Sequence, residues 1–119
     1  MIEVRLTRRA IRDIEAIDRH SIEKWGRRVA SKYLSDLQSG MARLLDSPGL
    51  LQKRPESSLR LRFYPVREHM LICDRVGDRI LVLAVRHLAM DLPGRVAELE
   101  PTLILESELL AKRLEQRES

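Results

Sequence analysis

The sequence contains few of the residues on which several common protein chemistries depend. There is one cysteine, Cys73, and there are three histidines among 119 residues. A lone cysteine cannot form an internal disulfide, and the histidines are too far apart in the sequence to match the ligand spacing of a zinc site. We therefore expect a protein of a reducing, cytoplasmic compartment that binds no metal.

Long apolar runs and nucleotide-binding motifs are also missing. The apolar runs are short, such as residues 80–85, and fall far below the roughly 20 residues that span a bilayer. The N-terminal segment MIEVRLTRRA lacks the apolar stretch of a secretory signal. The patterns GxxxxGK[ST], GxGxxG after a strand, and HExxH do not occur. The sequence thus gives no support to membrane insertion or to nucleotide or zincin chemistry, and we expect no cofactor.

Aromatic residues are scarce, at 3% of the chain: Trp25, Tyr33, Phe63 and Tyr64. Three of them fall on periodic apolar patterns, so we expect structural roles for Trp25, Tyr33 and Phe63. Trp25 in particular is expected to anchor the core between a helix and the sheet, and a stacking role in function is the alternative.

Charge is plentiful but uneven. The chain carries 22 Lys+Arg against 18 Asp+Glu, a net charge of +4, and 18 of the basic residues are arginine. Residues 1–95 hold 19 basic and 12 acidic residues, whereas residues 96–119 hold 3 and 6. A basic body can attract RNA, DNA or an acidic protein partner. It can equally be a solvated surface, and charge alone does not distinguish these cases.

The first half of the sequence has the periodicity of one strand and two helices. Residues 2–6 alternate apolar and polar side chains, which predicts a half-buried strand. Thr7 is the expected cap of a helix that ends near His20, and Ser21 is the expected cap of a second helix that stops at residues 47–49. The second helix carries the strongest apolar stripe of the chain: Ile22, Trp25, Val29, Tyr33, Leu37, Met41 and Leu44. Together they predict a helical hairpin.

The second half predicts three strands and a final helix. Residues 59–64, 69–74 and 79–86 have strand patterns, and Gly77 marks a hairpin turn between the last two. Pro65 is expected to limit the first of these strands. The last is apolar on both faces and should lie centrally in a sheet. Pro93-Gly94 should break the chain, and Pro101 should open the final helix. We expect one domain: a body of residues 1–95 and an acidic helical extension of residues 96–119.

Basic side chains cluster at the predicted strands and form the main candidate site. These residues are Arg60, Arg62, Arg67, His69, Arg86 and His87. In a meander they can converge on a concave basic surface that binds a phosphate backbone or a protein partner, or that stabilises a charged transition state. A histidine there can act as an acid or base. Alternatively, these groups edge an ordinary sheet and pair with Glu68, Asp74 or Asp91.

Three stretches carry a family resemblance: LTRRAIRDI at residues 6–14, Trp25-Gly26 followed by Ala30 and Tyr33, and residues 59–91, which end in His-x-x-Met-Asp. Over residues 2–92 the chain resembles the RelE/ParE superfamily of small bacterial toxins, and the ParE branch most closely. The resemblance implies an α+β fold (β-α-α-β-β-β) with a helical hairpin on one face of a small, mostly antiparallel sheet, plus a C-terminal helix. It also implies a type II toxin–antitoxin module.

The implied partner is a small antitoxin, often with a ribbon-helix-helix part, whose C-terminal segment wraps the toxin. The toxin can also pair with itself or join a hetero-oligomer. The favoured target is DNA gyrase, inhibited by binding. One alternative is ribosome-dependent mRNA cleavage, in which Arg60, Arg62 and Arg86 supply charge and His87 transfers a proton. Another is an inactive protein that only binds an antitoxin. No tyrosine follows the last strand, which weighs against the nuclease.

Two features depart from the family pattern. Ala89 occupies a position before Met90-Asp91 that is often basic, which weakens the case for a target contact there. Residues 96–119 extend beyond the usual end of these toxins. This segment can dock on the sheet, add to the antitoxin interface, or pair two toxin chains.

Overall fold

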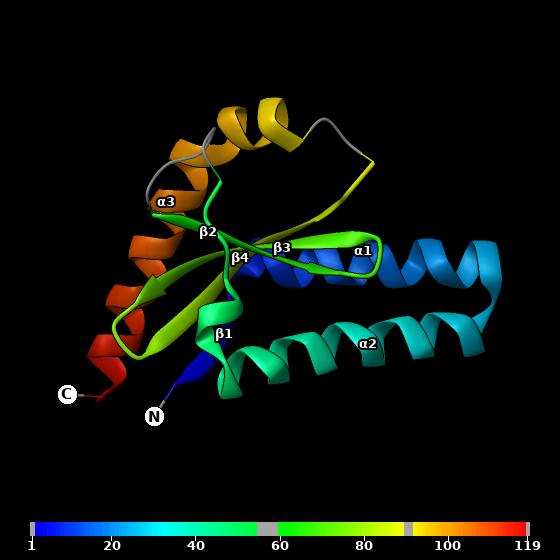
Figure 1. Cartoon of the computed structure of the whole chain (residues 1–119), viewed down its shortest axis with the longest axis horizontal. Coiled ribbons are helices and arrows are strands. Elements are labelled where there is room, and N and C mark those ends of the chain that lie inside the picture. The colour runs from blue at the N-terminus through cyan, green and yellow to red at the C-terminus, as the bar shows by residue number, and fades with distance from the viewer. Residues whose placement is uncertain (1, 55–59, 90–91, 119) are drawn as a thin grey trace.

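The computed structural model of the chain describes residues 2–54, 60–89 and 92–118 (Figure 1). The elements are β1 (Glu3–Leu6), α1 (Arg8–Trp25), α2 (Arg27–Asp46), a 3₁₀ turn η1 (Pro48–Leu50), β2 (Leu61–Val66), β3 (His69–Val76), β4 (Arg79–His87) and α3 (Leu92–Glu118). This order confirms the predicted α+β class. No helix in the described part of the chain is long and apolar enough to cross a bilayer.

The strands form one mixed sheet in the order β1-β4-β3-β2. β1 runs parallel to β4, and the other neighbours are antiparallel. The central position predicted for the apolar strand is confirmed, because residues 80–85 of β4 are all buried. The turn at Gly77 is also confirmed, and its φ of 60° is one that glycine adopts without a steric penalty.

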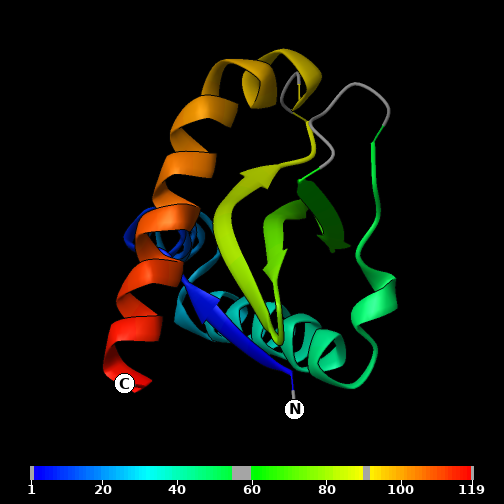
Figure 2. The same cartoon turned by 90° about the vertical axis from the view of Figure 1, so that its left-hand side faces the viewer.

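Helices cover both faces of this sheet (Figure 2). The α1–α2 hairpin contributes Ala10, Leu37 and Leu44 to one core cluster, against Val66, Leu71, Cys73, Ile80, Val82 and Val85. On the opposite face α3 contributes Val96, Leu103 and Leu114, against Leu61, Phe63, Met70, Ile72, Leu81 and Leu83. Of the three placements considered for the acidic C-terminal segment, the structure shows docking on the sheet. The helix begins at Leu92, ahead of the predicted boundary at residue 96.

The hairpin breaks at a different residue from the one predicted. α1 begins as expected, with Thr7 Oγ1 accepting a hydrogen bond from Ala10 N at 3.1 Å. It continues past His20 to Trp25, so Ser21 lies inside a helix and caps nothing. Gly26 separates the two helices with a φ of 89°, which side-chain-bearing residues rarely adopt. The predicted boundary was therefore wrong, since the backbone reversal needs glycine and not a capping hydroxyl.

Proline placement also differs from prediction. β2 passes through Pro65 to Val66, because an edge strand tolerates a residue that has no N–H to donate. Pro93 and Gly94 lie in the first turn of α3, where the N–H missing from proline has no helical partner to lose. Pro101 lies inside α3 and does not open it. The predicted start of the second sheet strand at Leu59 lies outside the described residues.

The closed end of the helical hairpin extends past the sheet (Figure 1). Its inner face there consists of the last turns of α1 and the first turns of α2, and none of the four strands β1 to β4 reaches the closed end (Figure 1). A cavity lies beneath this overhang, against the ends of β3 and β4.

Candidate functional site

The predicted basic residues divide between the two ends of the sheet. Arg67, His69 and His87 lie at one end, where Val66 pairs with His69 and His69 with His87. Arg62 pairs with Cys73, four positions further along β3, about 13 Å away at the usual rise of a strand. The prediction of one concave surface holding all six residues was therefore wrong.

Arg60 is held by the C-terminal helix and by the sheet. Its guanidinium contacts Asp74 of β3 at 2.6 Å and Glu108 of α3 at 2.8 Å. Ser107 Oγ donates to the same Asp74 carboxylate at 2.8 Å. The hydrogen bond to Asp74 is the main cause of the raised pKa of Arg60. This arginine fastens α3 to the sheet, which matches the structural alternative considered for it.

Arg86 points towards α1. Its Nε lies 3.9 Å from Oδ2 of Asp13, and the same oxygen accepts a hydrogen bond from Val85 N at 2.9 Å. Burial raises the pKa of Asp13. The Arg86 Nε is itself buried and has no hydrogen-bond acceptor among the described residues. A pairing of the sheet arginines with Asp91 lies outside the residues that the structure describes.

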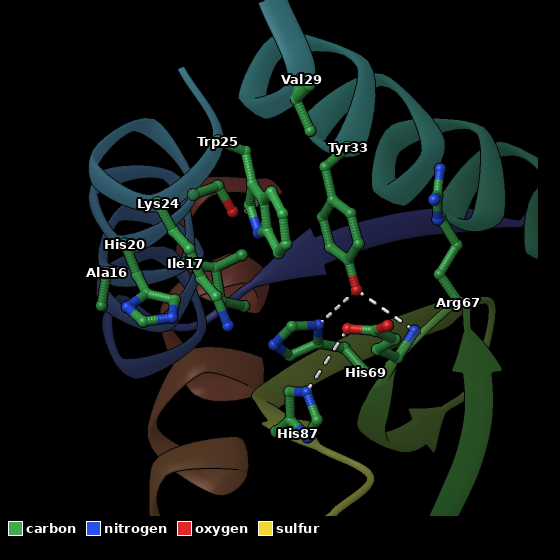
Figure 3. A pocket seen from close by; sticks show the side chains of 12 residues that line it. Ala16, Ile17, His20, Lys24, Trp25, Val29, Tyr33, Arg67, His69 and His87 are labelled. Atoms are coloured by element: carbon green, nitrogen blue, oxygen red, sulfur yellow. Dashed lines mark hydrogen bonds and ion pairs between the residues drawn. The ribbon is translucent and has the colours of Figure 1, made fainter. Parts of the chain in front are cut away.

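A cavity of about 570 Å³ lies beneath the hairpin overhang (Figure 3). We call it the hairpin groove; it is lined by Ala16, Ile17, His20, Ser21, Lys24, Trp25, Val29, Tyr33, Arg67, Glu68, His69 and His87. All three histidines of the chain line it. The sequence predicted that His69 and His87 lie close together. It gave no signal for His20, because nothing local shows which face of α1 overhangs the sheet.

The groove floor is formed by Tyr33, His69, His87 and Glu68, which contact one another in sequence. Tyr33 OH accepts from Glu68 N at 3.2 Å, and we assign its own proton to the hydrogen bond with His69 Nδ1, 2.5 Å away. The His69 ring meets His87 edge-on at 5.0 Å. His87 Nδ1 accepts from Ala89 N, and its Nε2 lies 3.6 Å from Glu68.

The protonation of His69 follows from this packing. Burial, together with the neighbouring His87, lowers the pKa of His69 to about 4. The ring is therefore neutral near pH 7, with its proton on Nε2. Burial also raises the pKa of Tyr33, so its hydroxyl keeps the proton that it donates to His69. The floor of the groove is polar, and His69 adds no positive charge to it.

Trp25 is not the core anchor that its position on the apolar stripe predicted. Its side chain is 61% exposed, on the wall of the hairpin groove, with Lys24 Nζ 5.1 Å from the ring centroid. Periodicity places Trp25 on the inner face of the hairpin, but the sheet does not extend as far as the last turn of α1, in which Trp25 lies. Phe63 is buried beneath α3, and Tyr33 is half-buried at the groove floor.

The groove is rimmed by cations, with Lys24 on α1 and Arg67 in the turn between β2 and β3. Arg67 has a left-handed φ of 53°, uncommon for a residue with a side chain. Its guanidinium lies 5.2 Å from the Tyr33 ring and pairs with Asp36. No group of three or more His, Cys, Asp or Glu side chains within the described ranges can hold a metal ion.

Comparison with known proteins identifies one family and two similar relatives. Residues 4–92 match the family described as "ParE toxin of type II toxin-antitoxin system, parDE". Toxin ParE of Escherichia coli is 33% identical over 94 residues, covering 78% of this chain and 91% of that protein. Toxin ParE1 of Caulobacter vibrioides is 31% identical over 88 residues, covering 73% and 90%.

A solved structure supports the fold. The one described as "Chromosomal ParDE TA system from P. aeruginosa" superposes with a TM-score of 0.66 at 21% identity, covering 74% of this chain and 97% of that one. The order of elements, the sequence match and this superposition agree. The chain therefore belongs to the family of ParE toxins of type II toxin–antitoxin systems.

Proposed function

We propose that this toxin inhibits DNA gyrase by binding to it, and that a small antitoxin neutralises the toxin. The resemblance to the ParE branch implies this target. The observation that favours binding over catalysis is the distance along the sheet that separates Arg60 and Arg62 from His87. General acid–base cleavage of RNA depends on positive charge beside the proton-transfer group.

The arginines assigned to the nuclease do not surround His87 in this way. Arg60 is fastened to Asp74 and Glu108, and Arg62 lies near the far end of β3. Arg86 faces Asp13 on α1. Bringing Arg60 to His87 would break the contacts that it makes with α3 and with Asp74, which favours a binding mode of action.

A gyrase assay tests the proposal. The purified toxin is incubated with gyrase, ATP and plasmid DNA, and we expect loss of supercoiling with accumulation of linear DNA. His87→Ala should inhibit gyrase as strongly as the wild type, because the imidazole transfers no proton in a binding mechanism. His87→Asn keeps a polar side chain at this position and is the control for a loss of packing. It should inhibit gyrase as strongly as His87→Ala and the wild type.

The opposite pattern identifies the alternative. If gyrase is unaffected, and ribosomes with mRNA show cleavage by the wild type that His87→Ala abolishes, the protein is an mRNA endonuclease and the gyrase proposal is wrong.

A further inference from the structure

The C-terminal helix α3 carries apolar side chains on the side that faces away from the sheet. Leu103 and Leu114 are buried beneath it, whereas Leu105 and Leu109 are 55% and 50% exposed. The two exposed leucines are four residues apart, so they lie on the same side of the helix. Ile11 of α1, which is 47% exposed, lines a groove together with Leu109. We call Leu105, Leu109 and Ile11 the outer patch.

Most of the outer patch belongs to the segment that extends the family domain. The family match ends at residue 92, ahead of both leucines. In Figure 2, α3 runs along the outside of the molecule, and no other element of the described chain covers its outer side. A helix that only closes the sheet needs apolar side chains on its inner face alone. The exposed leucines therefore indicate a second contact surface.

The exposed side of α3 has the pattern of a helix that pairs with another helix. Its outward positions recur at alternating steps of four and three residues. They are Glu98, Thr102, Leu105, Leu109, Lys112 and Gln116, all of them exposed. Neither Glu98 nor Lys112 makes an ion pair with another residue that the structure describes. This outer stripe thus has two leucines at its middle and opposite charges towards its two ends.

A second copy of the same helix matches the outer stripe. When two such helices run antiparallel about the midpoint between the leucines, Leu105 of each copy faces Leu109 of the other. Glu98 of each copy then lies near the basic end of the other, at Lys112 and Arg113. A parallel pair would instead bring Glu98 to Glu98 and Lys112 to Lys112, which like-charge repulsion disfavours.

The carboxylates beside the leucines do not oppose this pairing. Glu106 is bound to Arg9 at 2.7 Å, and Glu108 is bound to Arg60 at 2.8 Å, both within one chain. Their charges are therefore balanced before a second copy approaches.

A groove beside the stripe can receive a side chain of the second copy. It lies between α1 and α3, has a volume of about 230 Å³, and includes Ile11, Leu109 and Leu110 in its lining. Helices pack by placing the ridges of one into the grooves of the other. A leucine of the second copy can fill this groove, and by symmetry the reverse contact forms as well.

Nucleic acid and lipid fit the outer stripe less well than a second copy does. Residues 96–119 hold 3 basic and 6 acidic residues, so this segment repels a phosphate backbone and an anionic lipid surface.

We propose that two copies of this toxin associate through the outer sides of their α3 helices, antiparallel about a two-fold axis, with Leu105 and Leu109 at the centre. The inner side of each helix stays on its own sheet. The stripe from Glu98 to Gln116 is only about 27 Å long at 1.5 Å per residue, so we expect a dissociation constant in the micromolar range. The association involves the toxin alone and depends on neither gyrase nor an antitoxin.

Sedimentation equilibrium of the purified full chain tests the proposal. The mass should rise with concentration from 13.8 kDa towards twice that value. Leu109→Ala should weaken association at least about tenfold, because each dimer loses the side chain twice. Leu45→Ala on α2, at a leucine that is 42% exposed, is the matched control and should associate as the wild type does. In dilute solution, where all three proteins are monomeric, their circular dichroism spectra should coincide, which excludes misfolding.

Charge reversal tests the antiparallel arrangement. Glu98→Lys or Lys112→Glu alone should weaken association, because each brings like charges together. The double variant exchanges the two charges and should restore the wild-type association. In a parallel pair neither single variant would weaken association, since like charges face each other before and after the change, and the proposed arrangement would be wrong.

The remaining outcomes overturn the proposal. A wild type that stays monomeric at every attainable concentration contradicts it. A dimer that Leu109→Ala and Leu45→Ala affect equally is formed by a different surface. If the wild type is monomeric and Leu109→Ala loses binding to the antitoxin, the outer patch belongs to the antitoxin interface. None of these results bears on gyrase inhibition, which the supercoiling assay tests separately.

Discussion

His69 shows how one buried side chain sets the chemistry of the groove. Its Nδ1 accepts the Tyr33 hydroxyl proton, and its ring packs against His87. A neutral imidazole satisfies both contacts, whereas a protonated ring would lose the acceptor at Nδ1 and place a charge beside a second histidine. The packing therefore selects the neutral form.

This selection predicts a dependence of stability on pH. The pKa of His69 is about 4 in the folded chain against an ordinary value of 6.5. Between these values the unfolded chain binds a proton that the folded chain does not, so the free energy of unfolding falls as the pH is lowered from 6.5 to 4. Above pH 6.5 His69 is neutral in both the folded and the unfolded chain, so it no longer changes the free energy of unfolding with pH. Urea unfolding at several pH values measures it.

Two variants isolate the contribution of His69. His69→Asn keeps a hydrogen-bond acceptor for Tyr33 but does not titrate, so its stability should decline less over this range. The matched control is His20→Asn, since His20 is exposed and should leave the wild-type profile unchanged. A parallel decline in wild type and His69→Asn would show that carboxylates such as Glu3 and Asp36, whose pKa values are lowered by their ion pairs, account for the whole effect.

Single residues were predictable from the sequence where local chemistry decides their role. Thr7 caps a helix because its hydroxyl reaches the third amide beyond it, and Gly77 makes a turn that needs positive φ. Trp25 was not predictable in this way. Its burial depends on whether the sheet extends beneath it, which is a property of element lengths and not of the stripe on which Trp25 lies.

Among the elements, α3 is the one that extends this chain beyond the family domain. It buries Leu103 against the sheet and ties Ser107 to Asp74. Its acidic residues Glu106 and Glu108 pair with arginines of the basic body. Exposed ion pairs contribute little, so we attribute most of the docking energy to the apolar contacts.

Truncating the buried contact of α3 should therefore destabilise the whole chain. We expect Leu103→Ala to lower the free energy of unfolding by about 3 kcal/mol, because it leaves a cavity in the core cluster beneath α3. Leu109→Ala, on the exposed side of the same helix, should change it by less than about 0.5 kcal/mol. Chemical denaturation compares the two. Equal, small effects would mean that α3 contributes little to the fold.

Element order followed from periodicity, but element ends did not. The strand patterns of residues 69–74 and 79–86 lie within β3 and β4. Ser21 has the chemistry of a helix cap, yet α1 continues through it, because a hydroxyl caps a helix only where the backbone already turns. Pro101 has the chemistry of a helix start, yet the contacts of Leu103 and Val96 on both sides of it keep α3 continuous.

At the scale of the whole molecule, one sheet supports two cores. The hairpin and α3 pack on opposite faces of the same strands. Both core clusters therefore lose their contacts with the strands when the sheet opens. The convergence of His69 with His87 was predictable from the meander. The separation of Arg60 from His87 depends on the register of β2 against β3, in which Leu61 pairs with Asp74 and Val66 with His69, and the periodicity of single strands does not give that register.

This shared sheet predicts a single cooperative unfolding transition. Cys73, the one thiol of the chain, is buried in β3, and burial raises its pKa, so it should react with a thiol reagent only when the sheet opens. Far-ultraviolet circular dichroism reports mainly on the helices. We expect both signals to give the same urea midpoint, because no helix retains its apolar support after the strands separate. Loss of helical signal at a lower urea concentration than thiol labelling would show that α3 or the hairpin unfolds on its own, and the sheet would then be stable without one of its two covers.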